Sequence, residues 1–333
     1  MPLLKKKTVV AAAIETVEGT PIAALDNTDV FVISEEITRN VEFTYIERNF
    51  VGPSFARKPG RATNKLARLT FRTEIRGSGT AATPPKWAPF LEACGFAEAV
   101  TTSVAYTPVV PTNETYGAAN GNVALTIWVF RDGKAKKMKH CRGNVRVVGE
   151  SGGLAYFEFD FLGVYVDSAD VAYPDLSGST FDSTIPPLVE SAAFAFQDVT
   201  AGSAIIRAFT VDMGNNIVPR WDASSASGIK SIIITDSNTT ATIDPEEPLV
   251  GETGWQSTDS DKRFSDNDVG AFSIVIGTAA GNKLTITAPA ATVQVTGVSE
   301  GDRDGLAVDN VTLAFNAPDD EDPDVSRILF THS

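Results

Sequence analysis

The chain has 333 residues, of which 43% are hydrophobic, and carries a net charge of −14 at pH 7. This hydrophobic content excludes a disordered chain, and the length is sufficient for two domains of ordinary size. The strong negative charge argues against a protein that clamps nucleic acid with a basic face.

The charge is unevenly distributed along the chain. Residues 1–180 hold 20 basic and 19 acidic side chains, a net of +1, whereas residues 181–333 hold 8 and 23, a net of −15. No apolar run approaches the ~20 residues that a membrane-spanning helix needs, and the N-terminus lacks the pattern of a signal peptide. The two cysteines give no disulfide framework. We therefore expect synthesis in a reducing cytosol and no membrane partner.

Two amphipathic strands are predicted near the start, at residues 40–50 and 66–76, where apolar and polar side chains alternate. The intervening residues 51–65 contain two prolines and two glycines and read as a long loop. Their cations form either a solvated face or, as we favour, a contact with an acidic surface on another copy of the protein. These cations are Arg57, Lys58, Arg61 and Lys65.

A short helix is predicted at residues 86–94, behind a flexible entry that ends in Pro84 and Pro85. Its apolar side chains recur at helical spacing on one face, and Gly95 suits a left-handed C-cap. A helix this short is not stable alone, so we expect it to plug the open face or end of a β-sandwich. The plug residues are Trp87, Phe90, Leu91 and Cys94.

Further alternating segments at 122–141 and 143–166 predict strands joined by tight reversals. The following residues, 167–187, are rich in Ser, Asp and Pro and read as a linker. We therefore place a boundary between a first domain, 1–180, and a second, 181–333.

The second half repeats the order of elements with little residue identity. Residues 204–214 occupy the place of the first strand, residues 215–228 that of the long loop, and residues 229–244 that of the return strand. Residues 245–255 occupy the place of the helix but keep little helical pattern, and 271–316 match the remaining strands. The alternative is a chance match of β patterns; a duplication predicts two tandem β modules.

Catalytic and metal-binding patterns are weak. His140 lies in a basic strand with no nucleophile elbow nearby, and His332 is one residue from the end. Cys94, His140 and Cys141 lack the spacing of a zinc site. The acidic runs at 302–305 and 319–324 do not match a calcium loop and read as a solvated turn and an acidic tail. We expect no enzyme activity and no cofactor.

The chain resembles the major tail tube proteins of long-tailed bacteriophages and prophages. The resemblance is carried by "KKKTVVAAAIETVEGTPIAA", "ITRNVEFTYIERNFVGP", "GSGTAATPPKWAPFLEACGFAEAV" and "HCRGNVRVVGESGGLAYFEFDFLGVYV". It is good over residues 5–170 and weaker to the end of the chain.

The resemblance implies a β-sandwich or split barrel flanked by one helix. Copies close into rings, and the rings stack into a tube through which double-stranded DNA passes without specific binding. The long loop, here 51–65, reaches the adjacent ring; its counterpart 215–228 contributes Arg220 and Trp221. Further implied partners are tape measure, tail terminator and distal tail proteins, and the implied location is the virion tail, assembled in the host cytoplasm.

With two modules in one chain, we expect three chains to form a ring of pseudo-sixfold shape. In the competing arrangement, residues 188–333 decorate the outside of a hexamer of first modules. The rival function is that of a secreted or surface β-sandwich binding module, such as a lectin or adhesin.

Overall fold

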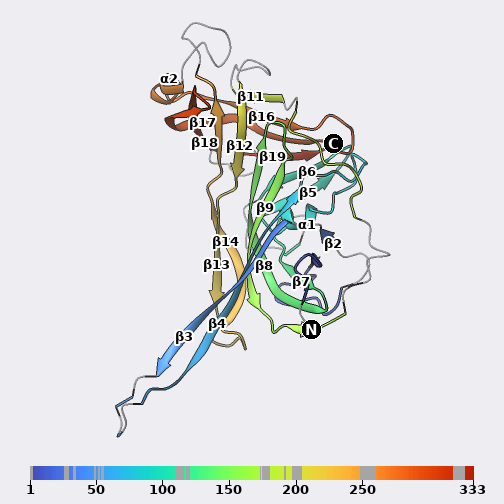
Figure 1. The fold of residues 1–333 in the computed structure, drawn as a ribbon, viewed down its shortest axis with the longest axis vertical. Coiled ribbons are helices and arrows are strands. Elements are labelled where there is room, and N and C mark those ends of the chain that lie inside the picture. The colour runs from blue at the N-terminus through green and yellow to red at the C-terminus, as the bar shows by residue number, and fades with distance from the viewer. Residues whose placement is uncertain are drawn as a thin grey trace.

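A computed structural model describes most of the chain and confirms the mainly β class. The described residues are 3–25, 30–32, 35–48, 50, 51, 53, 56–109, 116, 117, 121–172, 174, 181–190, 193–196, 205–247, 260–317 and 327–333. The molecule is elongated, with strands running along its length and one hairpin projecting from the lower end (Figure 1).

The first half forms one antiparallel sheet. Its strands are β1 (Thr8–Ile14), β2 (Val30–Val32), β3 (Glu35–Arg48), β4 (Lys58–Glu74), β7 (Leu125–Arg131), β8 (Lys134–Glu150) and β9 (Tyr156–Tyr165). Six of them pair in the order β3-β4-β9-β8-β7-β1, and β2 adds to β1.

The strands of the second half pair in the same order. They are β11 (Ala193–Phe196), β12 (Ile206–Asp212), β15 (Thr240–Pro245), β16 (Val269–Ile276), β17 (Leu284–Arg303) and β18 (Leu306–Phe315). The order is β12-β15-β18-β17-β16-β11, again antiparallel throughout. Each strand of this series therefore stands at the place of one first-half strand.

β8 of the first half and β12 of the second half join the two halves edge to edge. β12 pairs with the last part of β8, from Ala208 opposite Glu150 to Asp212 opposite Arg146. Eight strands thus form a continuous antiparallel series, β3-β4-β9-β8-β12-β15-β18-β17, which we call the ribbon. A second link joins β19 (Leu329–His332) to β17 and to β6 (Val104–Pro108), which pairs with β5 (Phe96–Val100).

The ribbon has one buried face and one open face because its side chains alternate. Along β9, Phe157, Phe159 and Phe161 are buried in the core, while Glu158 and Asp160 point to the open face. The phenylalanine rings pack at centroid distances of 5.8 Å. The hydrophobic core lies on the buried face and runs through both halves.

The predicted helix is present as α1 (Ala88–Glu92), on the buried face. Trp87, which precedes it, is 2% exposed and donates its indole N–H to the Arg76 carbonyl at 2.8 Å. Phe90 packs edge-on against Phe71 at 5.3 Å. Gly95 follows the helix with φ +91°, a conformation that glycine adopts without steric cost. The structure buries Leu91 and Cys94 as well.

The long loops expected at 51–65 and 215–228 are wrong in extent. β4 begins at Lys58, so residues 58–65 are strand rather than loop. In the second half, β13 (Asn215–Trp221) and β14 (Ile229–Ser237) form a hairpin closed by a turn at 222–228. Both segments are arms of hairpins. Their sequences show no strand pattern because they contain polar side chains, Pro and Gly and because neither of their faces is fully buried.

The second half keeps a short helix, which the sequence did not indicate. Helix α2 (Ser260–Ser265) lies between β15 and β16, where α1 lies between β4 and β7. It follows the segment 245–255, of which residues 248–255 lie outside the described residues, as does the acidic run 319–324. Part of the expected linker is ordered on the first half: β10 (Ala169–Asp170) pairs with β8, and Asp182 accepts the Lys86 N–H at 2.7 Å.

Candidate functional site

The two ends of the ribbon have unpaired edges. In the part of the chain that the structure describes, β3 pairs with β4 alone, so its outer edge is open from Glu35 to Arg48. At the other end, β17 beyond Val295 pairs, among the described residues, with β18 alone. An unpaired strand edge presents backbone N–H and C=O groups that can pair with another chain.

The junction between β8 and β12 shows how such edges meet in this protein. Five residue pairs align, and two ion pairs flank them. Arg146 lies 3.0 Å from Asp212, and Arg207 lies 2.7 Å from Glu150. Asn144 also donates to Asp212 at 2.8 Å. These charges are partly exposed and contribute little energy, so the backbone ladder and the packing below it hold the junction.

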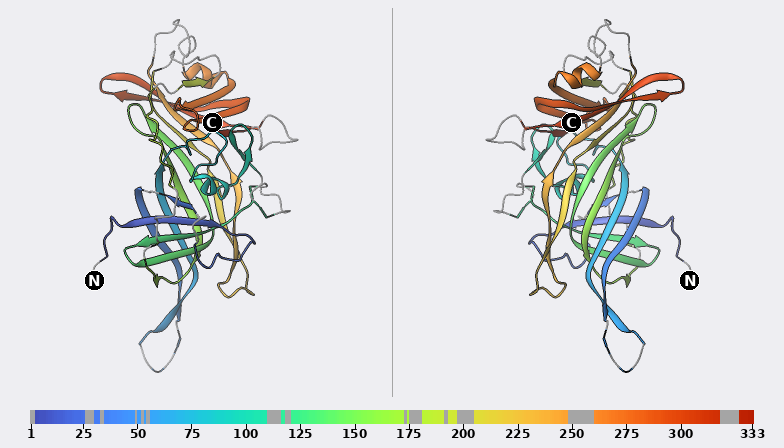
Figure 2. Two further views of the ribbon diagram at one scale, coloured as in Figure 1. Left: turned by 90° about the vertical axis from the view of Figure 1, so that its right-hand side faces the viewer. Right: turned by 90° about the vertical axis from the view of Figure 1, so that its left-hand side faces the viewer.

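The outer part of the β3–β4 hairpin, which we call the β3–β4 arm, projects from the body (Figure 2, blue). It carries exposed apolar side chains. Tyr45 is 61% exposed and Ile46 is 53% exposed, and Val41 is also exposed. The cations expected at a contact are spread along this arm. Arg57 and Lys58 lie near its tip, Arg61 lies opposite Ile46, and Lys65 lies near its base. Arg57 is 3.8 Å from Glu47, and Lys58 lies over the Phe50 ring. Exposed apolar side chains gathered on a long hairpin are typical of a protein–protein contact surface.

The β13–β14 arm lies against the ribbon instead of projecting. Its Ile229 and Ile232 are buried on the open face of the first half, against Leu66, Leu162 and Val164. Ile217 is partly buried against the same cluster. Arg220 and Trp221 are exposed near the far end of this arm, which points the same way as the β3–β4 arm (Figure 2).

Arginines on the open face of the first half are matched by carboxylates. Arg72 lies 3.0 Å from Glu35 and 3.2 Å from Glu36. Arg68 lies 3.5 Å from Asp160 and 3.6 Å from Glu42. Together with the Arg146 pairs described above, these contacts pair three arginines of this face with carboxylates.

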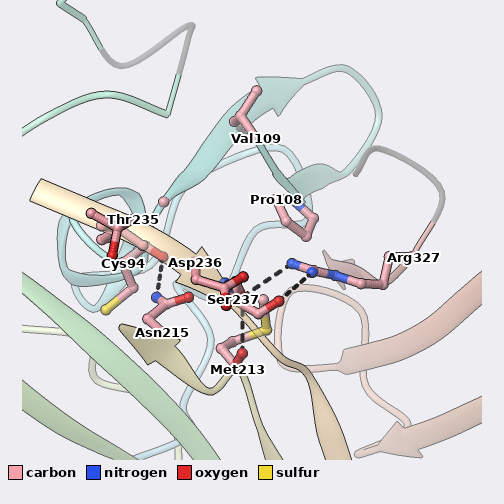
Figure 3. Close-up of a pocket in the computed structure, with 11 residues that line it drawn as sticks. Cys94, Pro108, Val109, Met213, Asn215, Thr235, Asp236, Ser237 and Arg327 are labelled. Carbon is pink, nitrogen blue, oxygen red and sulfur yellow. Dashed lines mark hydrogen bonds between the residues drawn. The ribbon is translucent and has the colours of Figure 1, made fainter. Parts of the chain in front are cut away.

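A cavity of about 240 Å³ lies where α1, the β13–β14 arm and the C-terminal segment meet (Figure 3). Asn215 spans it by donating to the carbonyls of Cys94 at 2.7 Å and Gly143 at 3.0 Å. Arg327 donates to the carbonyl and hydroxyl oxygens of Ser237. Burial raises the pKa of the Cys94 thiol well above its usual range, so this sulfur is a packing group rather than a nucleophile.

The two histidines and Cys141 also serve packing. His140 Nδ1 lies 2.7 Å from Glu15 Oε2, and Glu15 also accepts the Thr126 hydroxyl proton at 2.8 Å, which ties β8 and β7 to the residue after β1. His332 Nε2 donates to the Gly281 carbonyl at 3.1 Å. Burial raises the pKa of Cys141. Among the described residues, no group of three His, Cys, Asp or Glu side chains could hold a metal ion.

The sequence pointed to the cations and to the plug, but it missed the junction. Alternation in β12 and β8 shows that each is a strand and says nothing of which strands pair. The charge complementarity of Arg146 and Asp212 was present in the sequence, 66 residues apart, yet a single pair of opposite charges is no signal by itself.

Comparison with known proteins adds no family. No protein-family model matches the chain, and no curated protein sequence matches it significantly. In the described part of the chain, no helix is long and apolar enough to cross a membrane.

Proposed function

We propose that this chain is a structural protein that assembles into stacked rings and forms the tail tube of a long-tailed bacteriophage. The observation that carries the proposal is the ribbon. Its two halves have the same strand order, they join through β8 and β12, and the corresponding edges of β17 and β3 are unpaired. The same type of junction, made between copies, continues the ribbon head to tail.

The dimensions of such a ring favour three copies. Three ribbons supply 24 strands, which at ~4.8 Å spacing give a circumference of ~115 Å and a backbone diameter of ~37 Å. Side chains fill roughly 10 Å of this width, and strand tilt widens the bore. A DNA duplex about 20 Å wide therefore passes. Six copies would give a diameter of ~73 Å, far wider than the duplex requires.

In this proposal the open face lines the channel, apart from the lower part of the first half that the β13–β14 arm covers, because the core and α1 occupy the other side. Its arginines face carboxylates, as Arg68 and Arg72 do, so phosphates passing through meet little free positive charge. Unpaired cations would bind the DNA backbone and slow its transit.

The strand order also opposes the arrangement in which residues 188–333 decorate a hexamer. β12, β15, β18 and β17 continue the sheet of the first half rather than lying outside it. The arms are the proposed contacts with the next ring, through Arg57, Lys58, Arg61 and Lys65 and through Arg220 and Trp221. Tape measure, tail terminator and distal tail proteins are the further partners proposed from the resemblance.

Negative-stain microscopy of the purified protein tests the proposal. Rings or tubes with a central channel are expected. Dispersed monomers at all protein concentrations would overturn it and would favour the secreted or surface binding module, whose ligand could then be sought on glycan arrays.

A further inference from the structure

Strand register relates the two arms residue by residue. In the first half, Glu42, Leu66 and Val164 lie side by side across β3, β4 and β9. In the second half, Asp212, Thr240 and Ala314 lie side by side across β12, β15 and β18. The bulges agree with this alignment. The bulge of β8 between Lys139 and Arg142 lies next to the row of Leu162, and the bulge of β17 between Val295 and Gly297 lies next to the equivalent row of Thr312.

The arms leave the sheet at equivalent places. In the first half the register shifts between Glu42 and Thr44. In the second half the strand bends after Asp212 at Gly214, whose φ of +64° is accessible to glycine without strain. Beyond the bend, Ile46 opposite Arg61 takes the place of Ile217 opposite Ile234.

The second-half arm already shows what such an arm contacts. It crosses the ribbon junction and packs on β4 and β9 of the first half, where Ile217 meets the cluster of Leu66, Leu162 and Val164. The neighbour that it covers is the half to which its own strand β12 is paired.

Among the residues that the structure describes, the first-half arm has no such neighbour in its own chain. Ile46, the counterpart of Ile217, is 53% exposed. The surface equivalent to the cluster lies on the open face of the second half, at Thr240, Thr312 and Ala314, all of which are partly exposed. These side chains are uncharged and present methyl groups, which suits an isoleucine.

We propose that the β3–β4 arm docks on a second copy of this chain, with Ile46 over Thr240, Thr312 and Ala314 of that copy. The inference rests on the proposed ring. It assigns Ile46, opposite Arg61, to a contact within the ring and leaves the outer part of the arm, with Arg57 and Lys58, for the next ring. The edge register follows from the same alignment. The alignment makes Glu42 equivalent to Asp212 and Gly301 equivalent to Arg146. Because Asp212 is opposite Arg146 within the chain, Glu42 is opposite Gly301 of the second copy.

Matched substitutions on the arm provide the first test. Ile46→Asn removes the docking side chain, and Glu47→Asn changes an exposed neighbour that the docking does not use. Both sites are exposed, so both variants should fold, which circular dichroism and thermal melting check. We expect Ile46→Asn to raise the concentration needed for ring formation by about tenfold and Glu47→Asn to leave it unchanged.

Substitutions on the receiving face provide an independent test. Ala314→Arg places a long charged side chain under the arm and should block ring formation. Asn310→Arg lies on the same face of β18, four residues before Ala314, and should not. If rings of Ile46→Asn and Ala314→Arg form as in the wild type, the docking is wrong. It is equally wrong if these variants form rings that merely fail to stack, since the arm would then contact the next ring.

Cross-linking locates the contact directly. Ile46→Cys combined with Ala314→Cys should give covalent multimers in isolated rings on treatment with a short bismaleimide, and neither single variant should. The native Cys94 and Cys141 are 2% and 0% exposed, so they do not compete. Absence of cross-links in intact rings overturns the docking but leaves the ring proposal standing. A wild-type protein that never forms rings overturns the ring proposal itself.

Discussion

Glu92 is a buried carboxyl group in α1, and burial destabilises its ionised form. It is 5% exposed, and its Oε2 atom has no hydrogen-bond partner in the structure. Burial, with a smaller contribution from Glu98, raises its pKa from 4.5 to about 7. The folded protein therefore retains this proton at pH values where the unfolded chain has lost it.

The pH dependence of stability should report this group. Because the folded state binds more protons between these two pKa values, the free energy of unfolding falls as pH rises from about 5 to about 8, by up to about 3 kcal/mol. Glu92→Gln should flatten that decline in urea titrations at several pH values. Glu300→Gln, at an exposed site on β17, should keep the wild-type decline. Equal pH profiles for wild type and Glu92→Gln would show that Glu92 is hydrated.

Trp87 should be the largest single contributor to the anchoring of α1. Its ring packs on Phe157 at 4.9 Å and on Tyr106 at 5.4 Å, within the buried core. Trp87→Ala is expected to cost ~3–5 kcal/mol in free energy of unfolding. The matched control is Trp221→Ala, since Trp221 is 56% exposed and should contribute little. Similar melting of Trp87→Ala and wild type would contradict the packing.

At the scale of elements, the tip of the β3–β4 arm carries the next prediction. The tip is cationic and the second half of the chain has a net charge of −15, so reversal of the tip charge replaces attraction by repulsion. Combining Arg57→Glu and Lys58→Glu should leave the fold and the rings intact and prevent stacking. Light scattering follows tube growth, and electron microscopy counts the rings. Normal tubes from this double variant would rule out the tip as the contact.

The elements also show where sequence patterns inform and where they do not. The alternation of apolar and polar side chains predicted β9 and residues 66–74 of β4, because one face of each strand lies against the core. Residues 58–65 gave no such signal, since strand side chains exposed on both faces need not alternate. In β13, Pro219 suggested a loop, but a proline is tolerated there because the hairpin pairs on one side only.

Helix α2 could not be predicted from the sequence, for a different reason. Its six residues, SDKRFS, present no apolar stripe, and the side chains that it buries are Ser260 and Arg263. Its position between β15 and β16 is set by the strands around it. Likewise, the candidate site depends on β8 meeting β12, and pairing between strands about 60 residues apart is a property of the packed molecule.

At the scale of the whole molecule, the ribbon predicts the number of copies in a ring. Native mass spectrometry of isolated rings should give three chains, and a tube reconstruction should give threefold symmetry with a sixfold outline. This follows from eight strands in each ribbon and a circumference of 24 strands. Six chains in a ring would mean that the second half lies elsewhere and would end the duplication hypothesis.

The junction between β8 and β12 also affects the rate at which ring assembly is nucleated. Two separate modules meet at a rate that falls with dilution, whereas two modules in one chain meet at a fixed effective concentration set by the connecting segment. In the proposed ring, half of the six junctions form when each chain folds. Nucleation then requires three molecules to meet instead of six, so its rate depends on roughly the third power of protein concentration, and assembly can start at concentrations where unlinked modules would remain apart.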